Sequence, residues 1–182
     1  GLEQIMGSKP TTYAEDCHNR ETLRRIFKEE KIEGVIHFAA FKSVGESVAF
    51  PALYYENNIG SLLALNSVMR EFGIKNLVFS SSCTVYGQPE QIPVTEETPF
   101  QEAQSPYGAT KQMCERILMD EVVANKELRV VALRYFNPIG SHPSAEIGEL
   151  PLGVPQNLVP FITQTAICYT QCLVFNGAVF CQ

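Results

Sequence analysis

The chain has 182 residues, 45% of them hydrophobic, which is enough for one domain with a substantial core. Its formal net charge of −6 and its lack of basic runs argue against nucleic acid and anionic membranes as partners. No apolar run reaches the length of a membrane span and no signal peptide is visible, so we expect a cytoplasmic protein of the cytosol. The six cysteines lack zinc or haem spacing, which favours reduced thiols and no bound metal.

Short apolar runs alternate along the chain with longer amphipathic stretches, and this alternation predicts strands and helices in turn. Strands are expected over residues 10–16, 34–40, 75–82 and 129–136. Helices are expected over 21–30 after an Asn19 cap, from Pro51 to a left-handed Gly73, from Pro106 after a Ser105 cap, and again from Asn157. In the two long helices, the residues expected to face the core are Leu62, Leu63, Leu65, Val68, Met69 and Phe72, then Met113, Ile117 and Leu118.

The alternation predicts an α/β fold with a parallel sheet that carries helices on both faces. A dinucleotide-binding fold of this kind normally opens with a strand, a G-x-G-x-x-G loop and a helix, and no such loop occurs here. We therefore expect a partial Rossmann-type, doubly wound sheet over residues 1–137 that lacks its first strands and its glycine loop. Residues 138–182 would begin a smaller substrate-binding domain, and a natural start is expected upstream because the first methionine is Met6.

Three side chains suited to acid–base chemistry are expected to meet at the carboxyl end of strand 75–82. That strand ends in three hydroxyl residues, the last of which is Ser82, at the sheet edge where ligands bind in such folds. Tyr107 and Lys111 lie four residues apart, so one face of the next helix carries both. A neighbouring ammonium, and a cationic nicotinamide ring, would lower the pKa of a phenol from its usual value of about 10. Tyr-x-x-x-Lys alone also fits an exposed helix pair, but the whole constellation favours a catalytic site.

Three motifs resemble those of UDP-glucose 4-epimerases (UDP-galactose 4-epimerases), which belong to the extended short-chain dehydrogenase/reductase superfamily. They are S-S-S-C-T-V-Y-G at positions 80–87, S-P-Y-G at 105–108 with Lys111, and L-R-Y-F-N-P at 133–138. The resemblance runs in register over roughly positions 10–167. It implies NAD as the cofactor, with Ser82, Tyr107 and Lys111 as the catalytic residues that also contact NAD. From about residue 168 the chain departs from the family pattern.

The resemblance also implies further contacts to NAD. Asp16 would hydrogen-bond the adenine amino group beside the backbone of Cys17, although an Asp that caps the turn into the next helix is a rival interpretation. Lys42 would lie on the nicotinamide side of the site, where a solvated lysine is the alternative. The remaining residues assigned to NAD by resemblance are Phe38, Ala39, Ala40, Asn57 and Phe136.

A UDP-hexose is the implied substrate. By resemblance, Asn137, Asn157 and Leu158 would bind it together with Lys42, Ser82 and Tyr107. Sugar-nucleotide dehydratases carry acidic residues directly after the Ser or Thr, whereas this chain has Cys83 and Thr84 there, which favours epimerisation. His37 is expected to be a core histidine, and Tyr86 and Tyr135 to be packing aromatics.

The expected reaction is inversion at carbon 4 of UDP-galactose and UDP-glucose through a transient 4-keto sugar, within galactose metabolism. Tyr107 would move the hydroxyl proton, Ser82 would hold the same oxygen, and Lys111 would support the tyrosine and the ribose. The full-length family pairs as a homodimer through two long helices, here near 51–72 and 106–123. Two alternatives stay open: a catalytically silent, truncated isoform, and another sugar-nucleotide epimerase of the same superfamily.

Overall fold

The computed structural model describes residues 2–140, 142–144, 146–147, 157–166, 172–175 and 178–181. These residues form two compact units. One comprises Ala14–Phe136, and the other comprises Gly1–Tyr13 together with Asn137–Gln182. The sheet and both long helices lie in the first unit, so it is described first.

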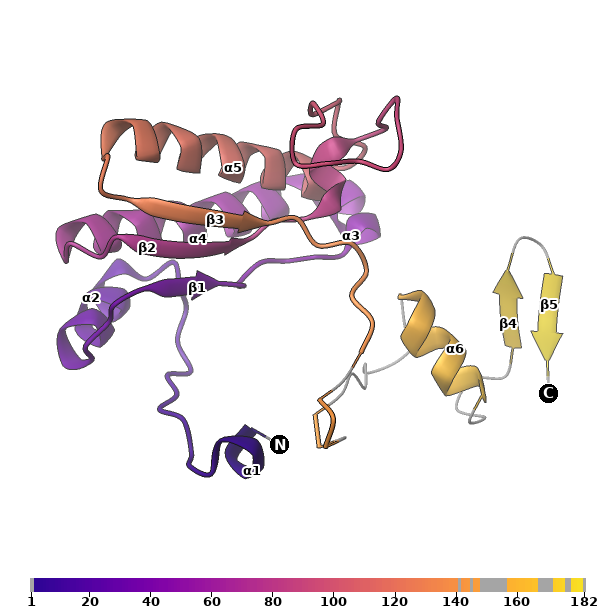
Figure 1. Ribbon diagram of the computed structural model, residues 1–182, viewed down its shortest axis with the longest axis horizontal. Coiled ribbons are helices and arrows are strands. Elements are labelled where there is room, and N and C mark those ends of the chain that lie inside the picture. The colour runs from indigo at the N-terminus through magenta and orange to yellow at the C-terminus, as the bar shows by residue number, and fades with distance from the viewer. Residues whose placement is uncertain are drawn as a thin grey trace. The chain divides into compact units, whose positions relative to one another are not determined.

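The first unit contains a parallel three-stranded sheet, as the sequence predicted. Its strands are β1 (Val35–His37), β2 (Asn76–Ser80) and β3 (Arg129–Leu133), with β2 in the centre. The helices of this unit are α2 (Arg20–Glu29), α3 (Val44–Ala49), α4 (Pro51–Glu71), the 3₁₀ helix η1 (Cys83–Tyr86) and α5 (Pro106–Ala124). Figure 1 shows α4 and α5 running side by side along the strands. Each pair of parallel strands is thus connected through a long helix, as parallel pairing requires.

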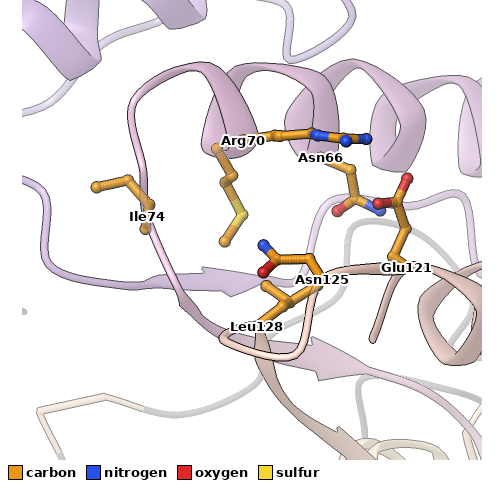
Figure 2. A pocket seen from close by; sticks show the side chains of 7 residues that line it. Asn66, Arg70, Ile74, Glu121, Asn125 and Leu128 are labelled. Carbon is orange, nitrogen blue, oxygen red and sulfur yellow. The ribbon is translucent and has the colours of Figure 1, made fainter. Parts of the chain in front are cut away.

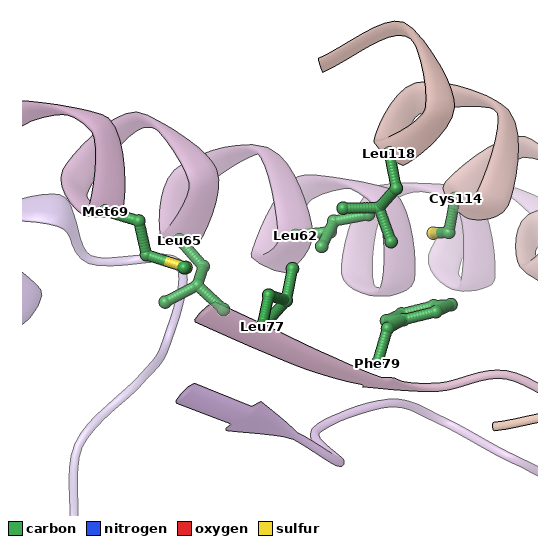
Figure 3. Packing of buried hydrophobic residues seen from close by; sticks show 7 residues of the cluster. All are labelled: Leu62, Leu65, Met69, Leu77, Phe79, Cys114 and Leu118. Atoms are coloured by element: carbon green, nitrogen blue, oxygen red, sulfur yellow. The ribbon is translucent and has the colours of Figure 1, made fainter. Parts of the chain in front are cut away.

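The core lies between the sheet and the two long helices (Figure 3). Leu77 and Phe79 point from β2 toward Leu62 of α4 and Leu118 of α5, and all four side chains are buried. Helix α2 joins this core because Phe27 meets Phe72 edge to face, with ring centroids 5.8 Å apart. Burial of such side chains contributes roughly 1.5–3 kcal/mol each, and this packing fixes α5 against β2.

The opposite face of the sheet is exposed in the described residues, which corrects the prediction of helices on both faces. Ile36 pairs in register with Val78, and Val78 with Val131. Ile36 is 64% exposed and Val131 is 54% exposed. Apolar side chains on both faces are typical of a parallel sheet with helices on both sides, so the sequence predicted helices over this face as well. The described residues do not cover it.

The predicted helix ends are confirmed by their caps. Asn19 accepts hydrogen bonds from two backbone N–H groups of α2, and the Ser105 hydroxyl accepts one from Gly108 in α5. Gly73 has a φ of 68°, the left-handed conformation that ends α4. Two core assignments were wrong: Leu63 and Met113 are exposed, because the helical period turns them away from the sheet.

The strands are shorter than predicted. Residues 10–16 form no strand, because none of the described strands pairs with them. The run 34–40 pairs only over Val35–His37, and the run 129–136 only over Arg129–Leu133. Apolar composition extends beyond the hydrogen-bonded ladder at both places, which is why the pattern overestimated strand length. The unpaired residues that follow these two strands include several of the predicted site residues.

The second unit has less regular structure in its described part. It contains α1 (Leu2–Met6), α6 (Leu158–Ala166) and an antiparallel pair, β4 (Cys172–Phe175) and β5 (Ala178–Cys181). The helix predicted from Asn157 is confirmed as α6. The expected divergence from the family begins at 168, and residues 167–171 lie outside the described part. Among the described helices, none combines the length and apolarity that a bilayer crossing demands.

A small pocket lies at the amino-terminal edge of the sheet, where α4 and α5 end (Figure 2). It has room for about one water molecule, so it cannot hold a nucleotide. The residues that line it are Asn66, Met69, Arg70, Ile74, Glu121, Asn125 and Leu128. The predicted site residues follow the carboxyl ends of the strands, at the other edge, so this pocket is not the candidate site.

Candidate active site

The exit of β2 carries the serine of the predicted site. The Cys83 backbone N–H donates to the Tyr135 carbonyl at 2.8 Å, which ties the chain beyond β2 to the chain beyond β3. Ser82 is buried and extended, and its hydroxyl accepts from the Thr84 N–H at 3.2 Å. That bond caps η1, so Ser82 has a fixed backbone at the point where the strand becomes a helix.

The first turn of α5 is held tightly against η1. A Cβ added at Gly108 would lie 3.3 Å from the Thr84 carbonyl oxygen, so this position favours a residue without a side chain. The Gln112 side-chain amide donates to the carbonyls of Val85 at 2.8 Å and Gln101 at 2.7 Å. These contacts bring the helix that carries Tyr107 onto the segment that carries Ser82.

Lys111 is 4% exposed and lies inside the site, so the structure excludes the exposed helix pair considered above. Its ammonium donates to the Ser80 carbonyl at 2.7 Å and stands 5.0 Å from the centre of the Phe79 ring. Burial lowers its pKa from the ordinary value. An ammonium has three N–H donors, and the bond to Ser80 uses one, so the others can serve a ligand with hydroxyl groups.

Tyr107 is half-buried beside Ser82, with the Lys111 ammonium 5.8 Å from the centre of its ring. Burial raises the pKa of Tyr107, while a hydrogen bond with Ser82 lowers it by less. The sequence predicted that a neighbouring ammonium and a cationic nicotinamide ring would lower this pKa, and the part concerning the ammonium is wrong for this structure. The ammonium is committed to the Ser80 carbonyl and lies over the ring, so desolvation of the phenol dominates.

A buried ion pair extends the same face of α5. Glu115 follows Lys111 by one helical turn and is 5% exposed. Its carboxylate accepts from the Ser81 hydroxyl and from the Arg134 guanidinium, with the shortest nitrogen–oxygen distance 2.8 Å. Sequence reasoning missed both Glu115 and Arg134. The spacing of positions 107, 111 and 115 places all three on one face, which was the available signal.

The cofactor side of the predicted site begins at the loop before α2. Asp16 accepts from the His18 backbone N–H at 2.9 Å and lies 2.7 Å from the His18 Nδ1. The His18 Nε2 lies 2.9 Å from the Asn57 carbonyl oxygen, so the histidine joins Asp16 to α4. A Cβ at Gly60 would come within 3.1 Å of the His18 ring, so a glycine there permits this approach. The turn-capping interpretation of Asp16 therefore holds, and it leaves the second carboxylate oxygen for a ligand.

Asp16, Cys17 and His18 also place three possible metal-ligand atoms within 4.8 Å of one another. Both ring nitrogens of His18 already have hydrogen-bond partners in Asp16 and Asn57. Asp16 raises the pKa of His18, and burial opposes that effect. The cluster is thus a hydrogen-bonded link between the loop and α4, and we assign no metal to it.

The remaining cofactor-side residues are open to solvent. Phe38 is 60% exposed, Lys42 is exposed, and Phe136 is 61% exposed, while Ala39 and Ala40 follow β1 as small residues that permit close backbone approach. Phe38 stacks near Tyr135, with ring centroids 6.3 Å apart. These side chains are therefore accessible to a ligand at the strand ends.

Asn58, which sequence reasoning passed over in favour of its neighbour Asn57, orders this loop. Its buried side chain accepts from the Phe41 N–H at 2.8 Å and donates to the Phe41 carbonyl at 3.1 Å. It also donates to the Thr110 hydroxyl of α5 at 3.1 Å. The amide thus ties the loop after β1 to both long helices, and Asn57 donates to Asn58 at 2.9 Å.

The predicted substrate residues Asn137, Asn157 and Leu158 belong to the second unit. Leu158 opens α6 and is half exposed, and Asn137 is exposed. The predicted catalytic residues and cofactor-side residues thus all lie in the first unit, whereas these three lie outside it. Their roles stay predictions.

A serine at a strand end and a Tyr-x-x-x-Lys helix on a parallel α/β sheet together define a site of the short-chain dehydrogenase/reductase class. The model of the NAD dependent epimerase/dehydratase family matches residues 4–156, and the chain belongs to that family.

Curated relatives agree with this assignment. The chain is 51% identical over 165 residues to UDP-glucose 4-epimerase of Neisseria meningitidis serogroup B, and 49% identical over 166 residues to that of Bacillus subtilis. Each match covers 91% of this chain and 49% of the relative. The chain therefore spans about half the length of the curated relatives it matches.

Solved structures share the fold. The crystal structure of UDP-glucose 4-epimerase from Bifidobacterium longum in complex with NAD+ and UDP matches with a TM-score of 0.87 and 46% identity. That match covers 91% of this chain and 50% of the other. The enzyme from Stenotrophomonas maltophila, with bound NAD and formylated UDP-arabinopyranose, matches with a TM-score of 0.90 and 42% identity, over 96% and 52% of the two chains.

Proposed function

We propose that the protein carrying this chain interconverts UDP-galactose and UDP-glucose by inversion at carbon 4, with NAD as its cofactor. The observation that supports this most is the meeting of Ser82, Tyr107 and Lys111 at the carboxyl edge of the sheet. The half-length matches to UDP-glucose 4-epimerases at about 50% identity support the same conclusion.

The residues of the first unit fit a dinucleotide. Lys111 retains N–H donors that suit ribose hydroxyls, and Asp16 retains a carboxylate oxygen that suits an exocyclic amino group. Ala39 and Ala40 leave the backbone accessible beyond β1, and Phe136 offers an exposed ring. We assign Cys17, Phe38, Lys42 and Asn57 to the same cofactor. When bound, NAD supplies a hydride acceptor and donor for carbon 4.

The chain's own residues handle the proton. In the proposed reaction the oxygen on carbon 4 gives its proton to the Tyr107 phenolate as the carbon–hydrogen bond breaks, and a 4-keto sugar forms. The Ser82 hydroxyl holds that oxygen, and Tyr107 returns the proton when hydride adds to the opposite face. The raised pKa of Tyr107 disfavours the phenolate that the first proton transfer needs, and the cationic nicotinamide ring of bound NAD would favour it. The neutral phenol formed in that transfer is the form that returns the proton.

Substrate and assembly complete the proposal. Asn137, Asn157 and Leu158 would contact the UDP-hexose, with Lys42 beside the sugar. A homodimer would form through α4 and α5, and exposed apolar side chains on these helices support that role: Leu53, Leu63, Met113, Met119 and Val123. The free thiols of Cys17, Cys83 and Cys114 suit the cytosol.

A chimera provides the test. Residues 2–166 of this chain would replace the matching half of the Neisseria meningitidis enzyme, and conversion of UDP-galactose to UDP-glucose would be measured. We expect NAD-dependent turnover with Tyr107 and its loss in a Tyr107→Phe chimera. A folded, NAD-binding chimera without turnover would contradict the proposal. The 182-residue chain assayed alone would show whether it is catalytically silent.

A further inference from the structure

Glu115 is a buried carboxylate that the proposed reaction does not use. It lies on α5 one turn after Lys111 and faces the exit of β2. It accepts from the Ser81 hydroxyl, and Ser81 is the direct neighbour of Ser82. One carboxylate therefore joins the helix of Tyr107 to the strand end of Ser82.

Arg134 extends this contact to the end of β3 and to the loop before α5. Its Nε donates to Glu115 at 3.0 Å and its Nη2 at 2.8 Å. Its Nη1 donates to the Tyr86 hydroxyl at 3.1 Å and to the Glu96 carbonyl at 3.0 Å, and its guanidinium stands 4.7 Å from the Phe100 ring centre. A planar, five-donor cation suits this arrangement.

Stability alone explains this pair poorly. Removal of two charges from water costs several kcal/mol per ion, and well-packed apolar side chains often serve as well. The pair instead holds four segments in one geometry: the exits of β2 and β3, the loop 87–105, and α5. Two of these segments, the exit of β2 and α5, carry Ser82 and Tyr107.

We propose that Glu115 is a positioning residue that, through Ser81 and with Arg134, sets the placement of Ser82 relative to Tyr107. Ser81 is buried, so its bond to Glu115 fixes the peptide that leads into Ser82. Ser82 follows Ser81 directly and lowers the pKa of Tyr107, so it lies near the phenol. The catalytic consequence of this placement rests on the proposed function, but the placement itself does not.

The titration of Tyr107 tests this placement without substrate or cofactor. Tyrosine labelled with ¹³C at Cζ gives one NMR signal per tyrosine, and Tyr107→Phe identifies the signal of Tyr107. The variants are Ser81→Ala, Glu115→Gln and Glu115→Ala in the 182-residue chain. Because the Ser82 hydrogen bond lowers the pKa of Tyr107, its loss should raise that pKa further. We expect a clear rise in Ser81→Ala and Glu115→Ala, and a smaller rise in Glu115→Gln, which keeps an acceptor for Ser81.

The matched control lies on the same helix. Arg116 pairs with Asp120 at 3.0 Å, and both side chains are exposed, so Asp120→Ala removes an ion pair next to Glu115 without touching Ser81. In the Asp120→Ala variant, Tyr107 should have the same pKa as in the wild type. Circular dichroism establishes which variants fold, and Ser81→Ala keeps the Glu115–Arg134 pair, so it carries the test even where Glu115→Ala unfolds.

The outcomes separate the two proposals. A folded Ser81→Ala variant with an unchanged Tyr107 pKa would overturn the positioning role, even with epimerase activity established. A raised pKa would support it, even where the chimera shows no epimerisation. Where turnover is measured, the same change should lower kcat by roughly 10- to 100-fold, because small misplacements of reacting groups have effects of that size. KM should change by about twofold or less, because Ser81 contributes no uniform binding.

Discussion

The two sides of the candidate site differ in how firmly the fold holds them. On the catalytic side, Ser82 and Lys111 are buried and each has a backbone hydrogen-bond partner. On the cofactor side, Phe38, Lys42 and Phe136 are exposed. The comparison shows that the residues proposed for proton transfer are held by the sheet and α5. The contacts proposed for NAD are instead surface features that a ligand would complete.

The largest effect is expected from Tyr107→Phe on the catalytic side. Loss of a positioned proton-transfer group costs about 10²- to 10⁴-fold in rate, and we expect a loss in that range or greater. The fold should persist, because the half-buried phenyl ring remains. Turnover of UDP-galactose and the thermal unfolding midpoint measure the two quantities. Near-normal turnover in the variant would exclude Tyr107 as the proton carrier.

The next effect concerns His37, which lies between the two sides. It is buried, as predicted, and burial lowers its pKa from 6.5 to about 4, helped by the charges of Lys111 and His18. The unfolded chain therefore binds more protons than the folded chain between these two pH values. Stability from this residue is complete above pH 6.5 and declines as the pH falls toward 4, by at most about 1.4 kcal/mol per pH unit.

Urea unfolding at several pH values measures this decline. A His37→Phe variant keeps an aromatic ring against Phe79, whose ring centroid lies 6.1 Å from that of His37. Its stability should depend less on pH in this window than that of the wild type. Identical pH profiles for the two proteins would show that His37 is not held neutral.

A smaller effect is expected from Asp16→Asn on the cofactor side. The substitution removes the charge that raises the pKa of His18, so that pKa should fall, as ¹H NMR of the imidazole protons would show. It also weakens an acceptor proposed for adenine, and we expect roughly a three- to tenfold loss of NAD affinity in the chimera. Unchanged affinity, measured by calorimetry, would limit Asp16 to its role in the turn.

The smallest effect is expected from Asp120→Ala on the outer surface of α5. Its ion pair with Arg116 is solvated, and exposed i,i+4 pairs contribute about 0.3–0.5 kcal/mol. Urea unfolding should show a change of that size or less, and less still at high salt. A loss of unfolding free energy as large as that from Glu115→Ala would mean that the exposed Arg116–Asp120 pair contributes as much as the buried Glu115–Arg134 pair.

Much of the fold followed from local sequence. The caps at Asn19, Ser105 and Gly73 act within a few residues, so the pattern located the starts of α2 and α5 and the end of α4 well. The convergence of Ser82, Tyr107 and Lys111 was predictable because parallel strands end at one edge. Strand lengths were not predictable, because pairing depends on partners distant in the sequence.

The polar contacts of the site were the least predictable part. Only its position one turn after Lys111 sets buried Glu115 apart from half-buried Glu121 before the chain is folded, and nothing local distinguishes Asn58 from Asn57. The effect of Lys111 on the pKa of Tyr107 was predicted wrongly because the prediction weighed a neighbouring charge and not the desolvation of the phenol. Burial and the competing carbonyl of Ser80 are properties of the assembled unit.

The order of the strands has a consequence for folding kinetics. Leu77 pairs with Val35 on one side and Val130 on the other, so each ladder closes only after a whole helix has been traversed. Such non-local closure is slow, because chain entropy is lost before the contacts form. The Cys83–Tyr135 and Glu115–Arg134 contacts need the pairing of β3 with β2, so they form only after the chain has passed through α5. In a refolding experiment, these two contacts would therefore report the closure of β3 on β2.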